Sequence, residues 1–528
     1  MRPMTNPPDL KTAEFQEPSH SAPGPAVLGN LRRELWDKAL DPLFDVVILG
    51  GGVNGACLYH NLCSRGYRVG LLDRRDFAAG TSQASGMMVW GGLLYLRNLD
   101  LGTVFSLSTA RDAMIADSAR VRGRSFRYVY PPRGGRGPLQ VRAALHLYWA
   151  MGCCRRKRPR TEGQFAESVL LRNGAPRGSI VYEEGMLDDS DARFTLDWMT
   201  PHSAGGNVAL NHARLDGGQF HPHDKLWRLD VADRLGTHQG TVRTRCLVNS
   251  TGAWTDRVNA QFGIRTPVKH VFSKGVYMCL ERNVQHLTPM IFETDTRDDH
   301  LTWVPWGPVA MFGPTETVVD KIEDGYRVTA EDLELLMREA DSLLQGGARP
   351  SQVVSLRCGL RSLVVPHDYV GNGRSTGLSR RSRCIPDPDR PWFSIYGGKL
   401  TGCQLVADEV AQRLQRHLPT PQFSWPPPPG PTEAVRWTHF PGLVDPVPSP
   451  EWCVQYEACC TLEDYLRRRT NIAQWVPREG LGRNGENYRF LLELNRRCFT
   501  RTDQDAVADL DRYVQRVENR FDAPLSHL

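Results

Sequence analysis

The sequence predicts an α/β protein in which a parallel-sheet domain, assembled from separate segments, is interleaved with an α+β domain and followed by an α-helical domain. Three observations support this prediction. A glycine-rich turn directly follows a buried strand near the N-terminus, further glycine-rich loops follow later strands, and a proline-rich stretch precedes a region of helical periodicity. We therefore expect one sheet to be built from distant parts of the chain.

The chain has 528 residues, enough for about two to four domains with sizeable cores. Its 40% hydrophobic and 23% charged residues exclude a mainly disordered or fibrous protein. No apolar run approaches the ~18–20 residues of a spanning helix, and the N-terminus lacks the apolar core of a secretory signal. We expect a cytoplasmic protein, or one bound peripherally to the inner face of a membrane.

The net charge of +6 is small for this length and gives no reason to expect nucleic acid as a partner. The 13 cysteines form no C-x-x-C pair and no Cys/His spacing typical of a zinc site. We expect most of them to be reduced, partly buried thiols, and we expect no metal.

The N-terminal segment is rich in Pro, Ser and Glu, so residues 1–30 are predicted to form a disordered tail. A short helix is predicted over 31–40. A strand pattern begins sharply after Pro42, and the run from Phe44 to Leu49 is typical of a buried parallel strand.

A G-x-G-x-x-G turn follows this strand directly. Gly50 permits the tight turn, Gly52 lets the backbone approach a pyrophosphate, and Gly55 allows close packing of helix on strand. A helix over 56–64 and a second strand ending in Asp73 complete a Rossmann-like βαβ unit. An acidic residue at this place binds ribose hydroxyls, which favours FAD or NAD over NADP.

Later glycine-rich loops favour FAD over NAD. Such loops recur at strand ends around 249–254 and 393–401. Together with the first turn they are spread over ~350 residues, which suits a long flavin dinucleotide across the edge of a sheet. The last loop leads into a helix, whose dipole would stabilise negative charge at the N1/O2 edge of a reduced flavin. The predicted FAD contacts are Gly50, Gly52, Asn54, Gly55, Asp73, Thr81, Ser82, Gly252, Gly398, Lys399, Leu400 and Thr401.

A linker and a helical C-terminal domain are predicted after the last loop. The run Pro426–Pro429 is typical of a semi-rigid spacer, Thr461–Asp464 is similar to a helix capping box, and apolar residues recur at helical spacing from Val507 to Val517. The predicted FAD-binding domain comprises residues 31–96, 205–260 and 357–418, the substrate domain 97–204 and 261–356, the linker 419–450 and the C-terminal domain 451–528.

Short motifs follow one another along most of the chain. They are GGGVNGA at 50–56, DFAAGTS at 76–82, GGLLYL at 91–96, SKG at 273–275, PW at 305–306, GPTET at 313–317, CGLRSL at 358–363, YGGKLTG at 396–402 and LEDYLRRRT at 462–470. On these motifs the chain, from about Leu31 to Arg520, resembles the FAD-dependent glycerol-3-phosphate dehydrogenase family of D-amino-acid-oxidase-like flavoproteins.

The resemblance implies oxidation of the secondary alcohol of sn-glycerol 3-phosphate to dihydroxyacetone phosphate. The hydride would pass to flavin N5, and the electrons would pass on to a quinone, or to oxygen as in oxidase relatives. The arginine of the GLR motif and the lysine of the GGK motif, here Arg361 and Lys399, would face the substrate. Both are cations, as a phosphate or carboxylate group requires, and Arg361 can hold two oxygens at once.

The flavin-facing segment departs from the family pattern, which reads SSKLIHGGLRYL. Met87, Trp90 and Leu94 stand where that pattern has lysine, histidine and arginine, whereas Tyr95 is kept. These replacements remove polar groups from the expected active-site wall, and Trp90 is expected to contact the substrate instead.

Two further differences are Arg381 in place of an acidic residue and Gly402 in place of a threonine. Three alternatives follow. The chain oxidises glycerol 3-phosphate with a rearranged wall, it is a paralogue that oxidises a different and bulkier anionic alcohol or an amine, or it binds flavin and lacks dehydrogenase activity.

The sequence identifies no base for the hydroxyl proton. Tyr95 and Lys399 are the predicted catalytic residues, because they are the best candidates to polarise the alcohol, and both are expected to bind substrate with Arg361. His270 and His367 lie near family motifs, but a lone histidine is more often a structural hydrogen-bonding group.

A dense set of arginines between 121 and 160 surrounds the aromatic segment Leu145–Met151. Basic residues beside aromatic ones suit an anionic membrane surface, although a solvated basic face explains the same pattern. The expected partners are a small phosphorylated substrate and a quinone or other electron acceptor. A membrane surface and a second copy of the chain, in a homodimer, are further possible partners.

Overall fold

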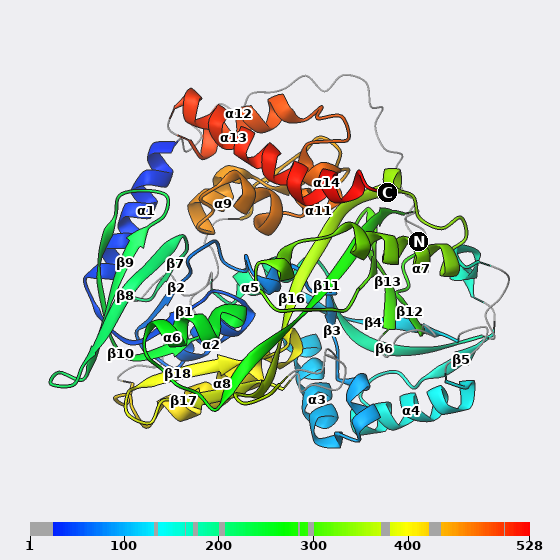
Figure 1. The fold of residues 1–528 in the computed structure, drawn as a ribbon, viewed down its shortest axis with the longest axis horizontal. Coiled ribbons are helices and arrows are strands. Elements are labelled where there is room, and N and C mark those ends of the chain that lie inside the picture. Colours follow the sequence, from blue (N-terminus) through cyan, green and yellow to red (C-terminus); the bar gives the residue numbers. More distant parts are fainter. Residues whose placement is uncertain are drawn as a thin grey trace.

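The computed structural model describes residues 25–130, 136–163, 165–172, 178–199, 206–282, 286–293, 300–370, 381–421, 434–500 and 502–528. Two sheets and a group of C-terminal helices make up these parts of the chain (Figure 1). They confirm the predicted α/β class with interleaved segments and a C-terminal helical region. Most of the predicted tail and Pro426–Pro429 lie outside the described residues.

The first sheet consists of β1 (Leu43–Leu49), β2 (Val69–Leu72), β7 (Val208–Leu210), β8 (Ala213–His221), β9 (Leu226–Asp233), β10 (Gln239–Asn249), β17 (Arg383–Pro386) and β18 (Trp392–Tyr396). Its parallel centre has the order β18-β10-β1-β2-β7. β17 pairs antiparallel with β18 at one edge, and the β8–β9 hairpin joins the sheet through β10.

β1 lies in the middle of this sheet, where Val47 is opposite Leu247 of β10 and Gly70 of β2. Its alternate side chains pack on opposite faces, as a strand covered on both sides requires. Val46 and Ile48 share a core with α2 (Val53–Ser64) and α8 (Cys403–Leu414), whereas Val47 packs with Trp36 on the other face. The helices predicted after the first and last glycine-rich loops are therefore both present.

The second sheet consists of β3 (Met88–Val89), β4 (Val121–Val129), β5 (Arg160–Glu162), β6 (Ser179–Leu187), β11 (Val268–Glu281), β12 (Met290–Glu293), β13 (His300–Trp306), β14 (Val309–Gly313), β15 (Thr317–Val319) and β16 (Val353–Pro366). Its order is β15-β11-β14-β13-β12-β4-β6-β3, with β16 on β11 and β5 on β6. The antiparallel β11–β16 pair runs from the first sheet toward the C-terminal helices (Figure 1).

The other helices are α1 (Pro25–Leu40), α3 (Leu101–Asp117), α4 (Pro138–Met151), α5 (Asp191–Asp197), α6 (Thr255–Gln261), α7 (Ala330–Leu343), α9 (Pro450–Tyr456), α10 (Leu462–Asp464), α11 (Ile472–Trp475), α12 (Tyr488–Cys498), α13 (Asp503–Val517) and α14 (Ala523–Leu525). A small hairpin of β19 (Trp437–Thr438) and β20 (Val447–Pro448) precedes α9. α1 begins at Pro25, so residues 25–30 are helical and not part of a tail as predicted.

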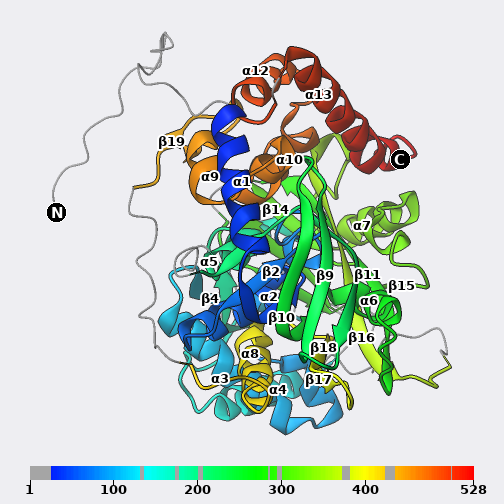
Figure 2. The ribbon, with the colours of Figure 1, turned by 90° about the vertical axis from the view of Figure 1, so that its left-hand side faces the viewer.

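The C-terminal helices share a hydrophobic core with the second sheet. Leu466, Ile472 and Leu491 belong to the same buried cluster as Val276 and Phe312 of that sheet. α1 lies alongside α9 and α12, so the N-terminal helix also contacts this region (Figure 2). The C-terminal helices are therefore packed onto the body of the protein.

Two predicted domain boundaries fall inside the second sheet. β3 belongs to it although 31–96 was assigned to the FAD-binding domain, and the boundary at residue 357 divides β16. The reason is the long antiparallel pairing of β16 with β11, which local sequence patterns do not reveal.

The packing of α2 on the glycine-rich turn leads to a first prediction. A Cβ added at Gly55 would lie 2.0 Å from the carbonyl oxygen of Gly50. Because the clash is with a backbone atom, no side-chain rotation can relieve it. We expect Gly55→Ala to lower the free energy of unfolding by about 1–3 kcal/mol in urea titrations. Gly102→Ala, whose Cβ would meet nothing within 4 Å in α3, should be neutral or stabilising.

Candidate active site

A cavity of about 1030 Å³ lies where the two sheets meet. It begins at the carboxyl ends of β1, β2 and β10 and extends past the end of β18 to residues of β11, β13 and β16. Among its lining residues are most of those predicted from the sequence: Gly50, Gly52, Asn54, Asp73, Thr81, Ser82, Trp90, Gly252, Arg361, Gly398, Lys399, Leu400 and Thr401. Segments more than 300 residues apart thus form one elongated cavity.

The glycine-rich turn presents the N-terminus of α2 to this cavity. Gly50 has a φ of +100°, and a Cβ there would lie 2.6 Å from the carbonyl oxygen of Ser250. Gly52 caps α2, and the Val53 N–H donates to Ser82 Oγ at 2.9 Å. The turn and the loop of Ser82 therefore surround a helix N-terminus, the usual place for a phosphate group in such folds.

Asp73 lies at the end of β2, on the wall of the same cavity. Its carboxylate accepts hydrogen bonds from the Gly51 N–H at 2.7 Å and the Arg75 N–H at 2.8 Å. Burial raises the pKa of Asp73 to about 6, against the lowering effect of these two backbone donors. Its carboxylate is thus positioned by the turn and is costly to ionise without a further donor.

The loop after β18 carries Lys399 and is supported from behind. Gly397 and Gly398 have φ values of +65° and +112°, which an L side chain adopts only with strain. The Gly397 N–H donates to His270 Nε2 at 3.0 Å, and burial lowers the pKa of His270 to about 4. His270 is therefore a neutral acceptor that positions this loop.

Arg361 and Lys399 are two cations that line this cavity from different sheets. Arg361 reaches it from β16, and its Nη1 donates to the backbone carbonyls of Lys274 and Thr315 at 3.4 and 3.3 Å. Lys399 reaches it from the first sheet, with Nζ 4.1 Å from the centroid of the Tyr95 ring. Two aromatic side chains, Trp90 and Tyr277, also line the cavity. This arrangement suits a small anion with an attached carbon chain.

The segment next to Trp90 is held by a buried charged cluster behind it. Glu184 accepts from Tyr148 Oη at 2.5 Å, from Arg111 Nη1 at 3.0 Å and from the Gly91 N–H at 3.3 Å. A Cβ at Gly91 would lie 2.4 Å from Tyr148 Oη. The cluster therefore determines where the Trp90 segment lies.

Some predicted site residues lie elsewhere. Tyr95 and Gly55 are not among the described lining residues of the cavity: Tyr95 contacts it through Lys399, and Gly55 packs on the turn. His270 and His367 line a second cavity of about 600 Å³ behind the Gly397 loop. Neither of these histidines lies on the described wall of the main cavity.

The sequence analysis missed several lining residues of the second sheet. Tyr277 follows Gly275 by two positions on β11, so the two residues lie on one face of the strand, and both line the cavity. His300 and Thr302 are likewise alternate residues of β13 and face the cavity. Two polar residues at alternate positions of an otherwise apolar strand indicate a polar face. The local sequence does not show that this face lines the cavity.

The polar groups of the cavity fit FAD. Asn54 Oδ1 and Ser250 Oγ are buried in the cavity wall and have no hydrogen-bond partner within the described residues. The cavity also offers an open helix N-terminus at Gly52, where an added Cβ would contact only Ser82 Oγ. Unused polar atoms beside a glycine-rich turn and the acidic Asp73 match what a dinucleotide cofactor requires.

The parallel sheet, the glycine-rich turn and the elongated cavity define a protein that binds a dinucleotide cofactor. A family model described as FAD dependent oxidoreductase matches residues 45–379. Since the match covers more than half of the chain, the chain belongs to this family of FAD-dependent oxidoreductases, and its cofactor is FAD.

Individual relatives agree with this assignment. The chain is 25% identical over 399 residues to the aerobic glycerol-3-phosphate dehydrogenase of Staphylococcus aureus strain MRSA252, covering 74% of this chain and 70% of that protein. The same values hold for the aerobic glycerol-3-phosphate dehydrogenase of Staphylococcus epidermidis strain ATCC 12228 / FDA PCI 1200. The resemblance found in the sequence is confirmed.

Two solved structures share the fold. The glycerol-3-phosphate dehydrogenase of Bacillus halodurans complexed with FAD matches with a TM-score of 0.65 and 18% identity, over 93% of this chain and 97% of that one. The L-α-glycerophosphate oxidase of Mycoplasma pneumoniae with FAD bound matches with a TM-score of 0.55 and 12% identity, over 71% of this chain and 95% of that one.

One departure from the family pattern has a local explanation. Arg381, which stands where the pattern has an acid, forms an ion pair with Asp100, the residue that caps α3. The pair joins the segment before β17 to the helix next to the Trp90 segment. Arg381 therefore does not add charge to the described cavity wall.

The position of Asp73 generates a prediction on pH. Ribose hydroxyls donate to a carboxylate but lose this acceptor when it is protonated, so FAD should bind more weakly as the pH falls through about 6. We expect the dissociation constant of FAD to rise about 10-fold from pH 7.5 to pH 5. Flavin fluorescence titrations measure this change, and an unchanged pH dependence in Asp73→Asn would contradict the assignment.

Proposed function

We propose that the protein oxidises the secondary hydroxyl of a small phosphorylated alcohol to a ketone, with sn-glycerol 3-phosphate as the first candidate. The observation that carries this proposal is that two cations from different sheets, Arg361 from the second and Lys399 from the first, line the same cavity as the glycine-rich turn. Cationic side chains bind a phosphate group strongly, and an arginine positioned by backbone carbonyls can hold two phosphate oxygens. The names of the relatives support the same substrate.

The lining residues imply an order along the cavity. Gly50, Gly52 and the N-terminus of α2, with Asn54, Thr81 and Ser82, would hold the pyrophosphate, and Asp73 with Gly252 would lie toward the adenosine end. The loop of Gly398, Leu400 and Thr401 would hold the flavin ring, next to the two cations. FAD, when bound, supplies the hydride acceptor.

The chain itself would bind and orient the alcohol. Arg361 would hold the phosphate, while Lys399 would contact the reacting hydroxyl and favour loss of its proton. Tyr95 would keep the ammonium group in place, since the Lys399 Nζ lies over its ring. The electrons would pass on to a quinone or another acceptor.

A bulkier anionic alcohol is the second candidate, and the aromatic wall favours it. Trp90 and Tyr277 line the same cavity as Arg361, so a larger apolar group attached to the phosphate could pack against these rings. The third alternative is a flavin-binding protein without dehydrogenase activity.

Anaerobic titration with glycerol 3-phosphate distinguishes these alternatives. Bleaching of the oxidised-flavin absorption band, with none from glycerol or amino acids, would support glycerol 3-phosphate as the substrate. A yellow protein that bleaches only with larger phosphorylated alcohols would favour the second candidate. No bleaching with any of them would contradict both proposals.

The role of Arg361 gives a prediction for the active substrate. Arg361→Lys keeps the charge but loses bidentate binding, so KM should rise about 10- to 100-fold with a smaller change in kcat. Steady-state kinetics with an artificial electron acceptor measure both constants. Arg381→Lys, which alters the exposed pair with Asp100, is the matched control and should leave KM within about 2-fold. Equal effects in the two variants would contradict the assignment.

Attachment to a membrane surface is a further part of this proposal. α3 and α4 lie side by side (Figure 1), and together with the turn before α3 they expose Leu99, Leu101, Phe105, Leu139 and Leu147. Arg142 on α4 and three basic residues just after it, Arg155, Lys157 and Arg158, are exposed too. Apolar side chains beside basic ones suit a surface of anionic lipids.

Other arginines of this stretch have structural roles instead. Arg127 is buried, stacks on Phe165 and pairs with Glu162, and Arg122 pairs with Asp188. Arg133, also part of the stretch, lies outside the described residues. No helix within the described ranges is long and apolar enough to cross a membrane, so attachment would be peripheral.

Vesicle binding tests this surface. The protein should sediment with vesicles that contain phosphatidylglycerol but not with pure phosphatidylcholine, and salt should weaken binding because part of it is electrostatic. Leu139→Glu combined with Leu147→Glu should weaken binding about 10-fold or more. Val444→Glu, which changes a fully exposed valine elsewhere, is the control. Binding that survives the double change would contradict the proposal.

A further inference from the structure

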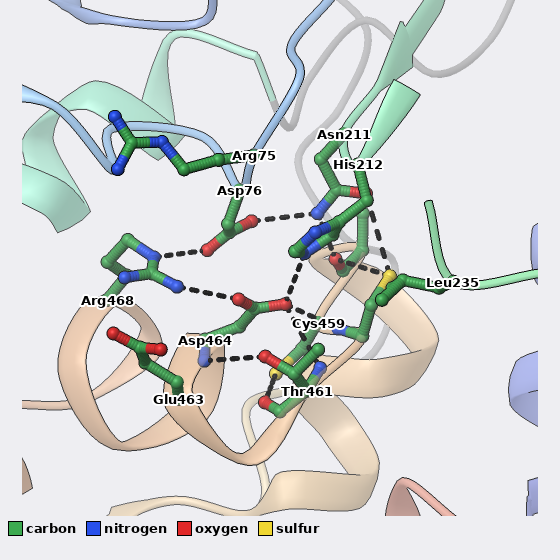
Figure 3. A network of polar contacts seen from close by, with 12 residues as sticks. Arg75, Asp76, Asn211, His212, Leu235, Cys459, Thr461, Glu463, Asp464 and Arg468 are labelled. Carbon is green, nitrogen blue, oxygen red and sulfur yellow. Dashed lines mark hydrogen bonds and ion pairs between the residues drawn. The ribbon is translucent and has the colours of Figure 1, made fainter. Parts of the chain in front are cut away.

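A buried ion-pair cluster joins the C-terminal helices to the loop that precedes and includes Ser82 (Figure 3). The loop runs from Asp76 to Gln83 and carries Thr81 and Ser82 on the wall of the FAD cavity. It is bound tightly to the glycine-rich turn: the Ala78 N–H donates to the Gly51 carbonyl at 2.9 Å, in addition to the bond from Val53 to Ser82. The loop and the turn thus form one unit beside the pyrophosphate site.

Two arginines of the C-terminal region bind the ends of this loop. Arg469 binds Asp76 with two nitrogens, at 2.7 and 2.9 Å. Arg468 Nε binds the same carboxylate at 2.5 Å, and its Nη1 donates to Gln83 Oε1 at 3.1 Å. One guanidinium therefore spans the first and last residues of the loop, and the second holds the first residue bidentately.

The arginines are themselves held from the C-terminal side. Arg468 Nη2 binds Asp464 Oδ1 at 2.6 Å, and Asp464 Oδ2 lies 3.0 Å from His212 Nε2 (Figure 3). Thr461 caps this helical turn through its contact with Asp464. Although Asp76, His212 and Asp464 have the spacing of a metal site, the guanidinium groups already occupy the carboxylates.

The charges of the cluster compensate one another in a dry environment. Burial disfavours the ionised Asp76, but Arg469 and Arg468 outweigh it and hold the pKa of the Asp76 carboxyl well below its usual range. Both partners of the Asp76–Arg469 pair are fully buried. Removal of one partner would leave an uncompensated charge beside the FAD cavity, so the loop would have to rearrange.

We propose that Arg468 and Arg469 are positioning residues for FAD: the docked C-terminal helices hold the 76–83 loop in the shape that binds the pyrophosphate. The coupling is reciprocal, since a loop ordered by FAD must in turn favour the docked C-terminal helices. This role concerns the binding of FAD alone, so it is independent of which alcohol is the substrate.

FAD affinity of the full-length protein tests the proposal. Arg468→Met should raise the dissociation constant of FAD at least 10-fold in flavin fluorescence titrations. The matched control is Arg467→Met: Arg467 is the neighbouring buried arginine, but it pairs with Glu479 inside the C-terminal region at 2.9 Å. This variant should lose thermal stability and keep FAD affinity within 3-fold. Equal weakening of FAD binding in both variants would overturn the proposal.

A second measurement reports the reciprocal effect. Addition of FAD to the FAD-free protein should slow hydrogen exchange in residues 461–475 of the wild type and of Arg467→Met, but not of Arg468→Met. If Arg468→Met does not fold, Gln83→Leu and Gln83→Glu replace it as a matched pair. Gln83→Glu is the control: both variants lose the 2.9 Å hydrogen bond from Gln83 Nε2 to the Ala79 carbonyl, but glutamate keeps an oxygen for Arg468 and should bind FAD more tightly than the leucine variant. Gln83→Leu also removes the contact of Arg468 with the loop end. This variant should weaken FAD binding by at least 3-fold, and unchanged affinity would overturn the proposal.

Discussion

The convergence of parallel strands at one edge of the first sheet is the constraint on which the rest of the structure depends. β1, β2, β10 and β18 all point the same way, so the residues that follow them meet at their carboxyl ends. Gly50, Asp73, Ser250 and Gly397 each follow one of these strands directly and line one cavity. FAD binding is thus a consequence of strand direction and of the small residues that the turns require.

The second sheet forms the part of the cavity wall that the first sheet does not reach. The parallel sheet contributes the loops at its carboxyl edge, and β11, β13 and β16 close the cavity with Tyr277, His300 and Arg361. Arg361 and Lys399 come from different sheets, so their relative position depends on how the sheets are held together. The Glu184 cluster and the Gly397–His270 contact hold the two adjoining segments in place.

The C-terminal helices contact the 76–83 loop on the side that faces away from the glycine-rich turn. They share a hydrophobic core with the second sheet and reach the first sheet through Arg468 and Arg469. A region that looks separate in the sequence, behind a proline-rich stretch, therefore contacts both sheets. Removal of one partner of such a buried pair leaves the other charge uncompensated, so the ion pairs disfavour any arrangement that separates these elements.

The sequence by itself determined the α/β class, the glycine-rich turn, Asp73 and the three loops of the FAD cavity, because these features depend on residue type at short spacing. It also pointed to Arg361 and Lys399 through motifs of the family. Only the tertiary structure decided that Tyr277, His300 and Thr302 line the cavity, that His270 supports a loop, and that β16 belongs to the second sheet. These placements depend on antiparallel pairings and buried ion pairs between distant residues, such as Asp76 with Arg469, which no local pattern contains.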